Sequence, residues 1–248
     1  MNKPDLPRLV AESRFIFVGT AARQDPGHPH SAAASGSTTP VRVDEILQST
    51  DVLRGLAGKQ VLVVSEHPDE LHGTLLLFSN GLVYGDHVVV QEVGHHEARP
   101  EAIREVKELL RAEAERPLRE RISSAALIVT GTVVSSTPAG KPSIRRSEHD
   151  PDWWIARVRV QSVLKGKPPQ HEVEVLFAHS TDIAWYKAPK LEDGASGIFL
   201  LHHVHAKDAP PEVGRAIYEV IDPLDFLPAD RLADVRRLLD QGQGEEER

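Results

Sequence analysis

The chain has 248 residues, of which 40% are hydrophobic and 27% are charged, a composition typical of a folded globular protein. Its 37 Asp and Glu residues outnumber its 29 Lys and Arg residues, and the net charge of -8 disfavours nucleic acid and anionic membranes as partners, because both attract basic proteins. The absence of cysteine excludes disulfides, thiolate nucleophiles and every zinc site that requires a Cys ligand.

Neither a secretory signal nor a membrane span is visible in the sequence. Residues 1–8 contain no apolar run that leads to a small-residue cleavage site. The longest apolar stretches, such as residues 125–134, are far shorter than the roughly 20 residues that cross a bilayer, and we interpret them as buried strands. A cytoplasmic protein without membrane contact is therefore expected.

The first half of the chain predicts a short helix, a set of strands and a second helix. Residues 6–12 can form the leading helix. Alternating apolar and polar residues, with Gly or Pro at the joints, predict strands at residues 15–20, 41–47, 60–64 and 73–78. Pro100 suits the first position of a helix, whose apolar stripe consists of Ile103, Val106, Leu109 and Leu110.

The second half repeats these elements in the same order. A leading helix is expected at residues 118–123, and strands similar to the first four are expected at residues 127–132, 158–164, 172–176 and 197–202. Asp230 can cap a final helix that should stop at Gly242 or Gly244 and whose apolar stripe consists of Leu232, Val235, Leu238 and Leu239. Four matching strands in one order indicate an internal duplication.

These elements predict a mainly β fold with flanking helices, arranged as two tandem small OB-like five-stranded barrels. The first unit and its trailing helix are expected to cover residues 1–117, and the second residues 118–240. Residues 241–248 are polar and acidic and predict a disordered tail. Loops rich in Pro, Gly and Ser lie at equivalent places in the two units, at residues 24–40 and 137–151.

Three stretches of the second unit carry a family resemblance: the strand that ends in Gly131-Thr132-Val133, residues 158–166 with their Leu-Lys-Gly turn, and Val173-Glu174-Val175. They resemble the small barrels of the tissue-inhibitor-of-metalloproteinase and netrin-module type, which occur in many bacterial proteins. The inhibitors chelate the zinc of their target with a disulfide-tied N-terminal Cys. Because this chain has no Cys, the resemblance implies the fold and not that mode of inhibition.

Two aromatic pairs are candidate binding residues. Trp153 and Trp154 begin a strand, so one ring should face the core and the other the opposite face. Trp185 and Tyr186 lie in a loop, where exposed aromatic rings commonly anchor protein interfaces. The alternative interpretation is that one of the strand tryptophans fills the barrel and that Trp185 covers its open end.

The chain has 13 histidines, and two of them are candidate metal ligands. A strand that holds His203 and His205 would point both imidazoles to one face, as a shared zinc or nickel ion requires. Further ligands would have to come from elsewhere, nominally from Glu148, His149, Asp150 and His179. The competing interpretation is that these are strand-end histidines that bind nothing.

Other patterns favour ordinary structure over chemistry. Ser180, Thr181 and Asp182 follow His179, but no Gly-x-Ser-x-Gly elbow accompanies them, and an Asx or Ser/Thr turn explains them more simply. Phosphate-binding loops, dinucleotide fingerprints and His-Glu-x-x-His are also lacking in the sequence. A basic cluster consists of Lys141, Arg145 and Arg146, and the carboxylates interleaved with it favour a solvated loop.

The duplication and the lack of a catalytic motif favour a non-enzymatic protein-interaction or scaffold protein with another protein as partner. One alternative is a metal-dependent hydrolytic enzyme that uses histidines of the second unit. Another is binding of an oligosaccharide or single-stranded nucleic acid on the barrel face. No cofactor is expected other than the divalent metal of the first alternative, and the sequence selects no oligomeric state.

Overall fold

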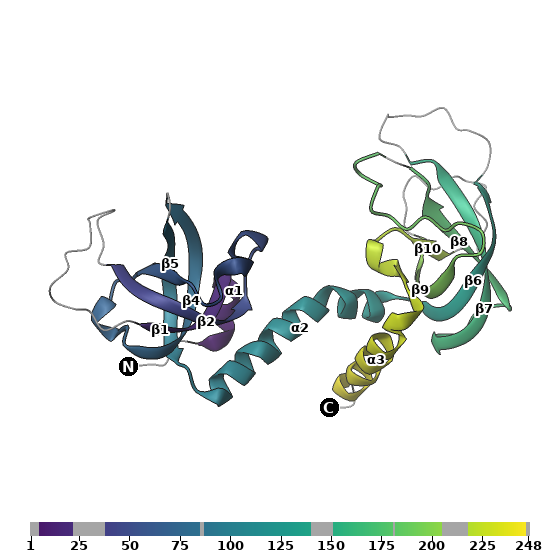
Figure 1. The fold of residues 1–248 in the computed structure, drawn as a ribbon. Helices are drawn as coiled ribbons and strands as arrows, with labels where there is room; N and C mark the ends of the chain where they lie inside the picture. The colour runs from purple at the N-terminus through teal and green to yellow at the C-terminus, as the bar shows by residue number, and fades with distance from the viewer. Residues whose placement is uncertain are drawn as a thin grey trace. The chain divides into compact units, whose positions relative to one another are not determined.

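The computed structural model describes residues 5–21, 38–84, 87–139, 151–180, 182–204 and 218–246 (Figure 1). It divides the chain into two compact units, Met1–Ala114 and Glu115–Arg248. Each unit contains a closed barrel of five strands with helices beside it. The predicted fold class, mainly β with two tandem OB-like barrels and flanking helices, is confirmed.

Barrel 1 is the barrel of the first unit. Its strands are β1 (Phe15–Ala21), β2 (Thr38–Gln48), β3 (Gln60–Val64), β4 (Gly73–Tyr84) and β5 (His87–Glu97). They are arranged in the order β1-β2-β3-β5-β4, and the pairing of β4 with β1 closes the barrel. Only the pair β3 and β5 is parallel, which is the strand arrangement of an OB-like barrel.

Barrel 2, in the second unit, repeats this arrangement. Its strands are β6 (Leu127–Pro138), β7 (Trp153–Lys165), β8 (Glu172–Ala178), β9 (Ser196–His203) and β10 (Tyr218–Val220). The pair β8 and β10 is parallel, and the pairing of β10 with β9 closes the barrel. A short strand, β11 (Phe226–Leu227), is added beside β9. All four predicted strand matches fall on equivalent strands of the two barrels.

The helices differ from the prediction in two places. The leading helix α1 (Leu6–Glu12) is as predicted, but residues 118–123 are not a separate helix and form the last part of α2 (Pro100–Ser124). Pro117 lies inside α2. A proline in a helix interior removes one backbone hydrogen bond, and here the helix continues past it. The last helix, α3 (Leu232–Glu246), continues through Gly242 and Gly244, so the expected stop there is wrong.

Glycine costs only about 1 kcal/mol relative to alanine in a helix interior, which is too little to end a helix by itself. The sequence predicts a disordered tail from residue 241, but residues 241–246 continue α3. Residues 247–248 lie outside the described residues. Among the helices of the described chain, none combines the length and the apolarity of a membrane-crossing segment.

Each barrel buries one set of side chains inside and a second set beneath its helices. In the first unit, Phe15 and Phe17 belong to the interior cluster, whereas Ile16 and Val18 belong to the cluster that contains α1 and α2. In the second unit, the interior cluster contains Leu127 and Val129, and the cluster with α2 and α3 contains Ile128. This alternation is the period of a strand buried on both faces.

The repeated Gly-Thr of the first strands has a steric reason. A Cβ on Gly19 would lie 2.8 Å from the carbonyl oxygen of Arg42, and a Cβ on Gly131 would lie 2.6 Å from that of Arg159. Both glycines lie next to a register shift between the first two strands of their barrel. Only glycine allows this close backbone approach, so the motif specifies the fold rather than a site.

The connection before the fourth strand of each barrel inserts one leucine into the interior. Leu71, just after the short 3-10 helix η2 (Pro68–Glu70), is 5% exposed and packs with the interior cluster of barrel 1. Leu191 is 1% exposed and packs with that of barrel 2. The Ser136 hydroxyl donates a hydrogen bond to the Leu191 carbonyl, which fixes this connection on barrel 2.

Candidate functional site

Trp153 and Trp154 point to opposite sides of β7, as the sequence predicts. Trp154 packs with the interior of barrel 2, where its ring centroid lies 6.5 Å from that of Phe177. Trp153 is 9% exposed and lies in a different cluster with Leu176 and Ala178. Because Leu176 and Ala178 alternate with interior residues of β8, this second cluster lies on the outer face of the β7–β8 pair.

Trp185 covers that outer face. Its ring meets the ring of Trp153 edge to face, with centroids 5.7 Å apart and an interplanar angle of 66°. Ala188, just after it in the chain, is buried in the same cluster. The half-buried Trp185 side chain therefore packs the connection between β8 and β9 against the outer face of barrel 2.

Residues 182–187, here named the Tyr186 turn, are held by hydrogen bonds. The Trp185 amide donates to the Asp182 carbonyl (2.9 Å), and the Ala184 amide donates to the Asp182 carboxylate (2.9 Å). The Asp182 amide in turn donates to the Ser180 hydroxyl at 3.2 Å. Ser180 and Asp182 thus make the turn interactions that the sequence favours over a nucleophile site; Thr181 lies outside the described residues.

Lys190 fastens the Tyr186 turn to the strand before it. Its Nζ donates to the Ala178 carbonyl at the end of β8 (2.6 Å) and to the Trp185 carbonyl (3.0 Å). Burial of the amino group lowers the pKa of Lys190. A charged donor shared by two carbonyls makes stronger hydrogen bonds than a neutral one, so the turn has a defined shape in the free protein.

The Tyr186 turn presents apolar side chains to solvent. Ile183 is 81% exposed and Tyr186 is 56% exposed. Lys187 adds a positive charge, with its Nζ 5.6 Å from the centre of the Tyr186 ring. Exposed large hydrophobic residues are individually ordinary, but here two lie three residues apart on a turn that Asp182 and Trp185 hold in place.

A second aromatic group lies at the end of β8. His179 is exposed and stacks on the half-buried Trp154, with centroids 4.4 Å apart and an interplanar angle of 24°. Phe177 lies beneath both rings, 6.2 Å from His179. These contacts assign His179 to ring stacking at this end of barrel 2.

The candidate metal ligands are only partly within the described residues. His203 is exposed at the end of β9, and its ring stacks on Tyr218 with centroids 5.9 Å apart. His205, Glu148, His149 and Asp150 lie outside the described residues. Within those residues, no group of three or more His, Asp or Glu side chains is arranged to hold a metal ion. Metal binding by His203 and His205 stays a prediction.

The outer face of the second and third strands is where OB-like barrels commonly bind oligonucleotides or oligosaccharides. In barrel 2, the cluster that contains Trp153, Leu176 and Trp185 covers part of this face. Farther along β7, Arg157 and Arg159 lie 3.8 and 3.3 Å from the Glu172 carboxylate. The basic cluster Lys141, Arg145 and Arg146 lies outside the described residues. In the described part of this face, aromatic and apolar side chains cover one end, and Arg157 and Arg159 share one carboxylate at the other.

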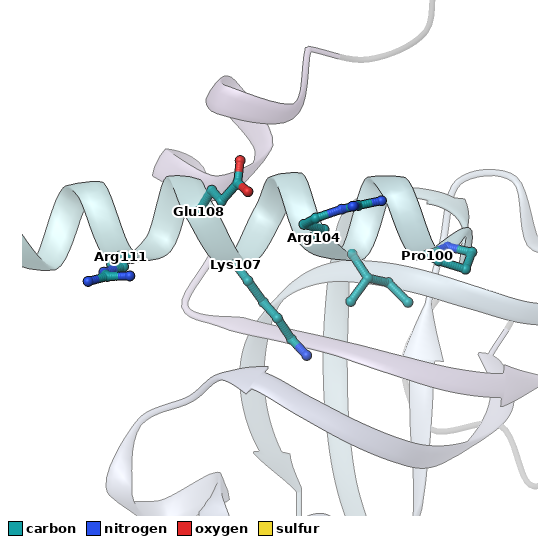
Figure 2. Close-up of a pocket in the computed structure, with 6 residues that line it drawn as sticks. Pro100, Arg104, Lys107, Glu108 and Arg111 are labelled. Atoms are coloured by element: carbon teal, nitrogen blue, oxygen red, sulfur yellow. The ribbon is translucent and has the colours of Figure 1, made fainter.

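A groove of about 590 Å³ runs along the first half of α2 (Figure 2). Its lining comes from this helix alone and consists of Pro100, Ile103, Arg104, Lys107, Glu108 and Arg111. Lys107 reaches from the helix toward the strands, where its Nζ pairs with the Glu45 carboxylate of β2 at 2.8 Å. The groove thus lies along a face of α2, and the Lys107–Glu45 ion pair connects this part of the helix to barrel 1.

Two polar clusters were not found from the sequence. In barrel 1, His95 Nδ1 lies 2.6 Å from the Glu92 carboxylate, and the two side chains are only 20% and 10% exposed. In the second unit, the fully buried Asp225 carboxylate accepts hydrogen bonds from Arg121. The sequence shows two adjacent histidines at 95 and 96 with Glu92 three residues before the first, but in a regular strand residues three apart point to opposite faces, so the sequence predicts no contact between Glu92 and His95.

Comparison with known protein families and with curated proteins found no match to this sequence.

Proposed function

We propose that the protein is a non-enzymatic interaction module that binds another protein through the Tyr186 turn of its second unit. The observation that carries this proposal is the contrast within the turn. Trp185 is anchored against Trp153, whereas its neighbours Ile183 and Tyr186 are 81% and 56% exposed. An anchored turn that displays apolar side chains can bind without first being ordered.

The preorganised turn lowers the entropic cost of binding. Association must offset the entropy lost by loops and side chains that become ordered at the interface. The hydrogen bonds of Asp182 and Lys190 have already fixed the backbone here. Complete burial of an Ile or Tyr-sized apolar side chain contributes about 1.5–3 kcal/mol, so these two side chains could supply the central contact of an interface.

The turn also indicates the chemistry of its partner. Ile183 and Tyr186 require an apolar pocket, and the Tyr hydroxyl requires a polar group at the rim of that pocket. Lys187, beside the Tyr186 ring, favours a partner with a carboxylate near the pocket. Because the chain as a whole carries a charge of -8, the positive charge of Lys187 would orient the carboxylate of the partner toward the Tyr186 turn.

The resemblance to barrels of the tissue-inhibitor and netrin-module type supports a binding role in general terms. The proposed binding does not include the zinc chelation by which the inhibitors act, because the chain has no Cys. The contact is instead placed on the connection between the third and fourth strands of barrel 2.

The test is an affinity capture from native lysate with mass spectrometry, using the full-length chain. The double variant Ile183→Asp/Tyr186→Ala removes the displayed surface without touching Trp185 or Lys190. A matched control is Val52→Asp, which changes a side chain that is 80% exposed in the first unit. We expect a protein that the chain and the control both retain and the double variant loses. Equal capture by all three would overturn the proposal.

A further inference from the structure

Strand β5 contains a β-bulge at the place where α1 packs on barrel 1. Phe78 of β4 pairs with Gly94, but the next residue, Ser79, pairs with Glu92, so Val93 is an extra residue in β5. We call this pairing the bulged register. Because side chains alternate strictly in a regular strand, the extra residue changes which face the following residues take.

The two bulge residues face outward, toward α1. Val93 packs with the outer cluster of barrel 1, which contains Leu9 and Val10 of α1. Gly94 faces the same helix, because a Cβ on this glycine would lie 2.8 Å from Leu9 Cδ2. Gly94 therefore leaves the space that the Leu9 side chain, only 4% exposed, occupies.

The residues on either side of the bulge both face the barrel interior. Glu92 lies opposite the buried Ser79, and His95 lies opposite Leu77 of the interior cluster. His95 Nδ1 and Glu92 Oε1 are 2.6 Å apart, and the two side chains are 20% and 10% exposed. In a regular strand, residues three apart point to opposite faces, so this hydrogen-bonded pair requires the bulged register.

A regular register is the alternative pairing of this strand. If Val93 lay opposite Phe78, every residue from Gly94 onward would turn to the other face of β5. The Val93 side chain would then lie where Gly94 now lies beneath Leu9, and the hydrogen-bonded pair would be lost. Packing of α1 on barrel 1 therefore requires the bulged register.

The charge of His95 determines how strongly the pair stabilises the bulge. A hydrogen bond with a charged donor is roughly twice as strong as one with a neutral donor. The hydrogen bond to Glu92 raises the pKa of His95 despite its burial, and the charge of Glu70 acts in the same direction. Burial alone would raise the pKa of Glu92, but the hydrogen bonds from His95 and Ser65 and the charge of His67 outweigh it and lower that pKa.

We propose that protonated His95 keeps β5 in the bulged register and thereby holds α1 on barrel 1, and that deprotonation of His95 releases this helix. The end of α1 is held separately, because Asn80 Nδ2 donates to the Glu12 carbonyl at 3.2 Å. Release therefore withdraws Leu9 and Val10 from the outer cluster while the chain stays attached at the end of the helix. The apolar outer face of barrel 1 becomes accessible as a result.

The direction of the pH dependence follows from the two groups of the pair. His95, whose pKa is raised, stabilises the bulged register fully below the ordinary histidine pKa of about 6.5, and this contribution is lost as the pH rises through its raised value. Glu92, whose pKa is lowered, contributes above the ordinary glutamate pKa of about 4.3 and loses its contribution as the pH falls through its lowered value. The helix is therefore held between these limits and released on the alkaline side.

Amide hydrogen exchange of the full-length protein at pH 6 and pH 9, corrected for the intrinsic rate, tests this inference. We expect the protection of residues 9–12 in α1 to fall at pH 9, on the order of tenfold for each unit by which the His95 pKa is raised. In His95→Gln these amides should exchange at both pH values as fast as those of the unmodified chain at pH 9. His96→Gln, at the neighbouring position of β5, should keep the pH step.

Gly94→Val tests the contact between the bulge and α1 separately from the titration. Its side chain fills the space of Leu9 but leaves Glu92 and His95 in place, so residues 9–12 should exchange rapidly at both pH values. The amides of β1 should stay protected in the unmodified chain and in His95→Gln, which distinguishes release of α1 from unfolding of barrel 1.

Four results would each overturn the inference. The first is equal protection of residues 9–12 at pH 6 and pH 9 in the unmodified chain. The second is a pH step that persists in His95→Gln. The others are a Gly94→Val variant in which α1 stays protected, and a loss of β1 protection together with that of α1 in the unmodified chain.

Discussion

Arg121 and Asp225 lie 104 residues apart in the sequence and meet in the second unit, where Arg121 Nε and Nη2 both donate to Asp225 Oδ1, at 2.8 and 2.6 Å. The carboxylate is fully buried and also accepts the amides of Ile221 and Asp222 at 2.9 Å. His202 Nε2 lies 3.2 Å away, close enough for an electrostatic contact but without the alignment of a hydrogen bond. One carboxylate thus joins α2, β9 and the segment before α3.

Asp225→Asn should strongly destabilise the second unit. Burial alone would raise the pKa of Asp225, but contacts with His202, Ile221, Arg121 and Asp222 lower it, so the group is a carboxylate at neutral pH. Removing the charge leaves the Arg121 guanidinium, 30% exposed, without its partner, and we expect a loss of roughly 3 kcal/mol in the free energy of unfolding by urea.

Asp234→Asn is the control for this substitution, because its carboxylate is 45% exposed and pairs with Arg231 at the surface. It should change stability little. The Asp225 contribution should be present above the ordinary aspartate pKa of about 3.9 and disappear as the pH falls through its lowered value. Equal stability losses for the two variants at pH 7 would contradict the assigned role of Asp225.

Gly131→Ala should destabilise the second unit because its Cβ would meet the Arg159 carbonyl at 2.6 Å. We expect about 1–3 kcal/mol, the usual cost of overpacking, in chemical denaturation followed by tryptophan fluorescence. Gly242→Ala is the matched control within the same unit. It lies in α3 with no atom within 4 Å of the added Cβ, so it should stabilise the unit by up to about 1 kcal/mol.

Lys165→Met should loosen the end of α2. The Lys165 Nζ donates to the carbonyls of Ile122 and Ser123, at 2.9 and 2.7 Å, in the last turn of that helix. A cation at this position satisfies free carbonyls and opposes the negative end of the helix dipole, which typically contributes 0.3–1 kcal/mol. Faster amide exchange at residues 124–126 with unchanged exchange in β8 is the expected result, and unchanged exchange at both places would refute it.

Trp185→Ala should separate the shape of the Tyr186 turn from its binding surface. Because Trp185 is only partly buried, we expect a stability loss of about 2 kcal/mol, below the 3–5 kcal/mol of a fully buried Trp. Tyr186→Ala should leave the midpoint of unfolding unchanged. Both variants should lose the partner, the first by disordering the turn and the second by removing a contact, and retention of the partner by Trp185→Ala would show that the turn shape is irrelevant.

The duplicated fold could be predicted because its signals are local. The Gly-Thr pairs at Gly19 and Gly131 and the alternation in four strands each appear within one short stretch of sequence, although the glycines are required by the close approach of the neighbouring strand. The fifth strands were not found: β10 has only three residues, and the bulge at Val93 interrupts the alternation of β5. The separate helix predicted at residues 118–123 is instead the last part of α2, which continues through Pro117.

The candidate site was predicted in part. Alternation along a strand was enough to predict that Trp153 and Trp154 point to opposite faces. The sequence did not reveal that Trp185 meets Trp153, or that Glu92 meets His95, because both contacts depend on how strands pair and on where a bulge occurs. Asp225 was missed for the same reason, since its partner Arg121 lies in a distant helix.

The most direct test of the central claim is photocrosslinking in the native host with a benzophenone amino acid placed at Tyr186 and, separately, at Val52. Both positions are exposed, so the two proteins should react equally with solvent and differ only in what lies against them. The proposed function predicts a discrete protein adduct from position 186 that position 52 does not form. The same adducts from both positions, or none from position 186, would contradict it.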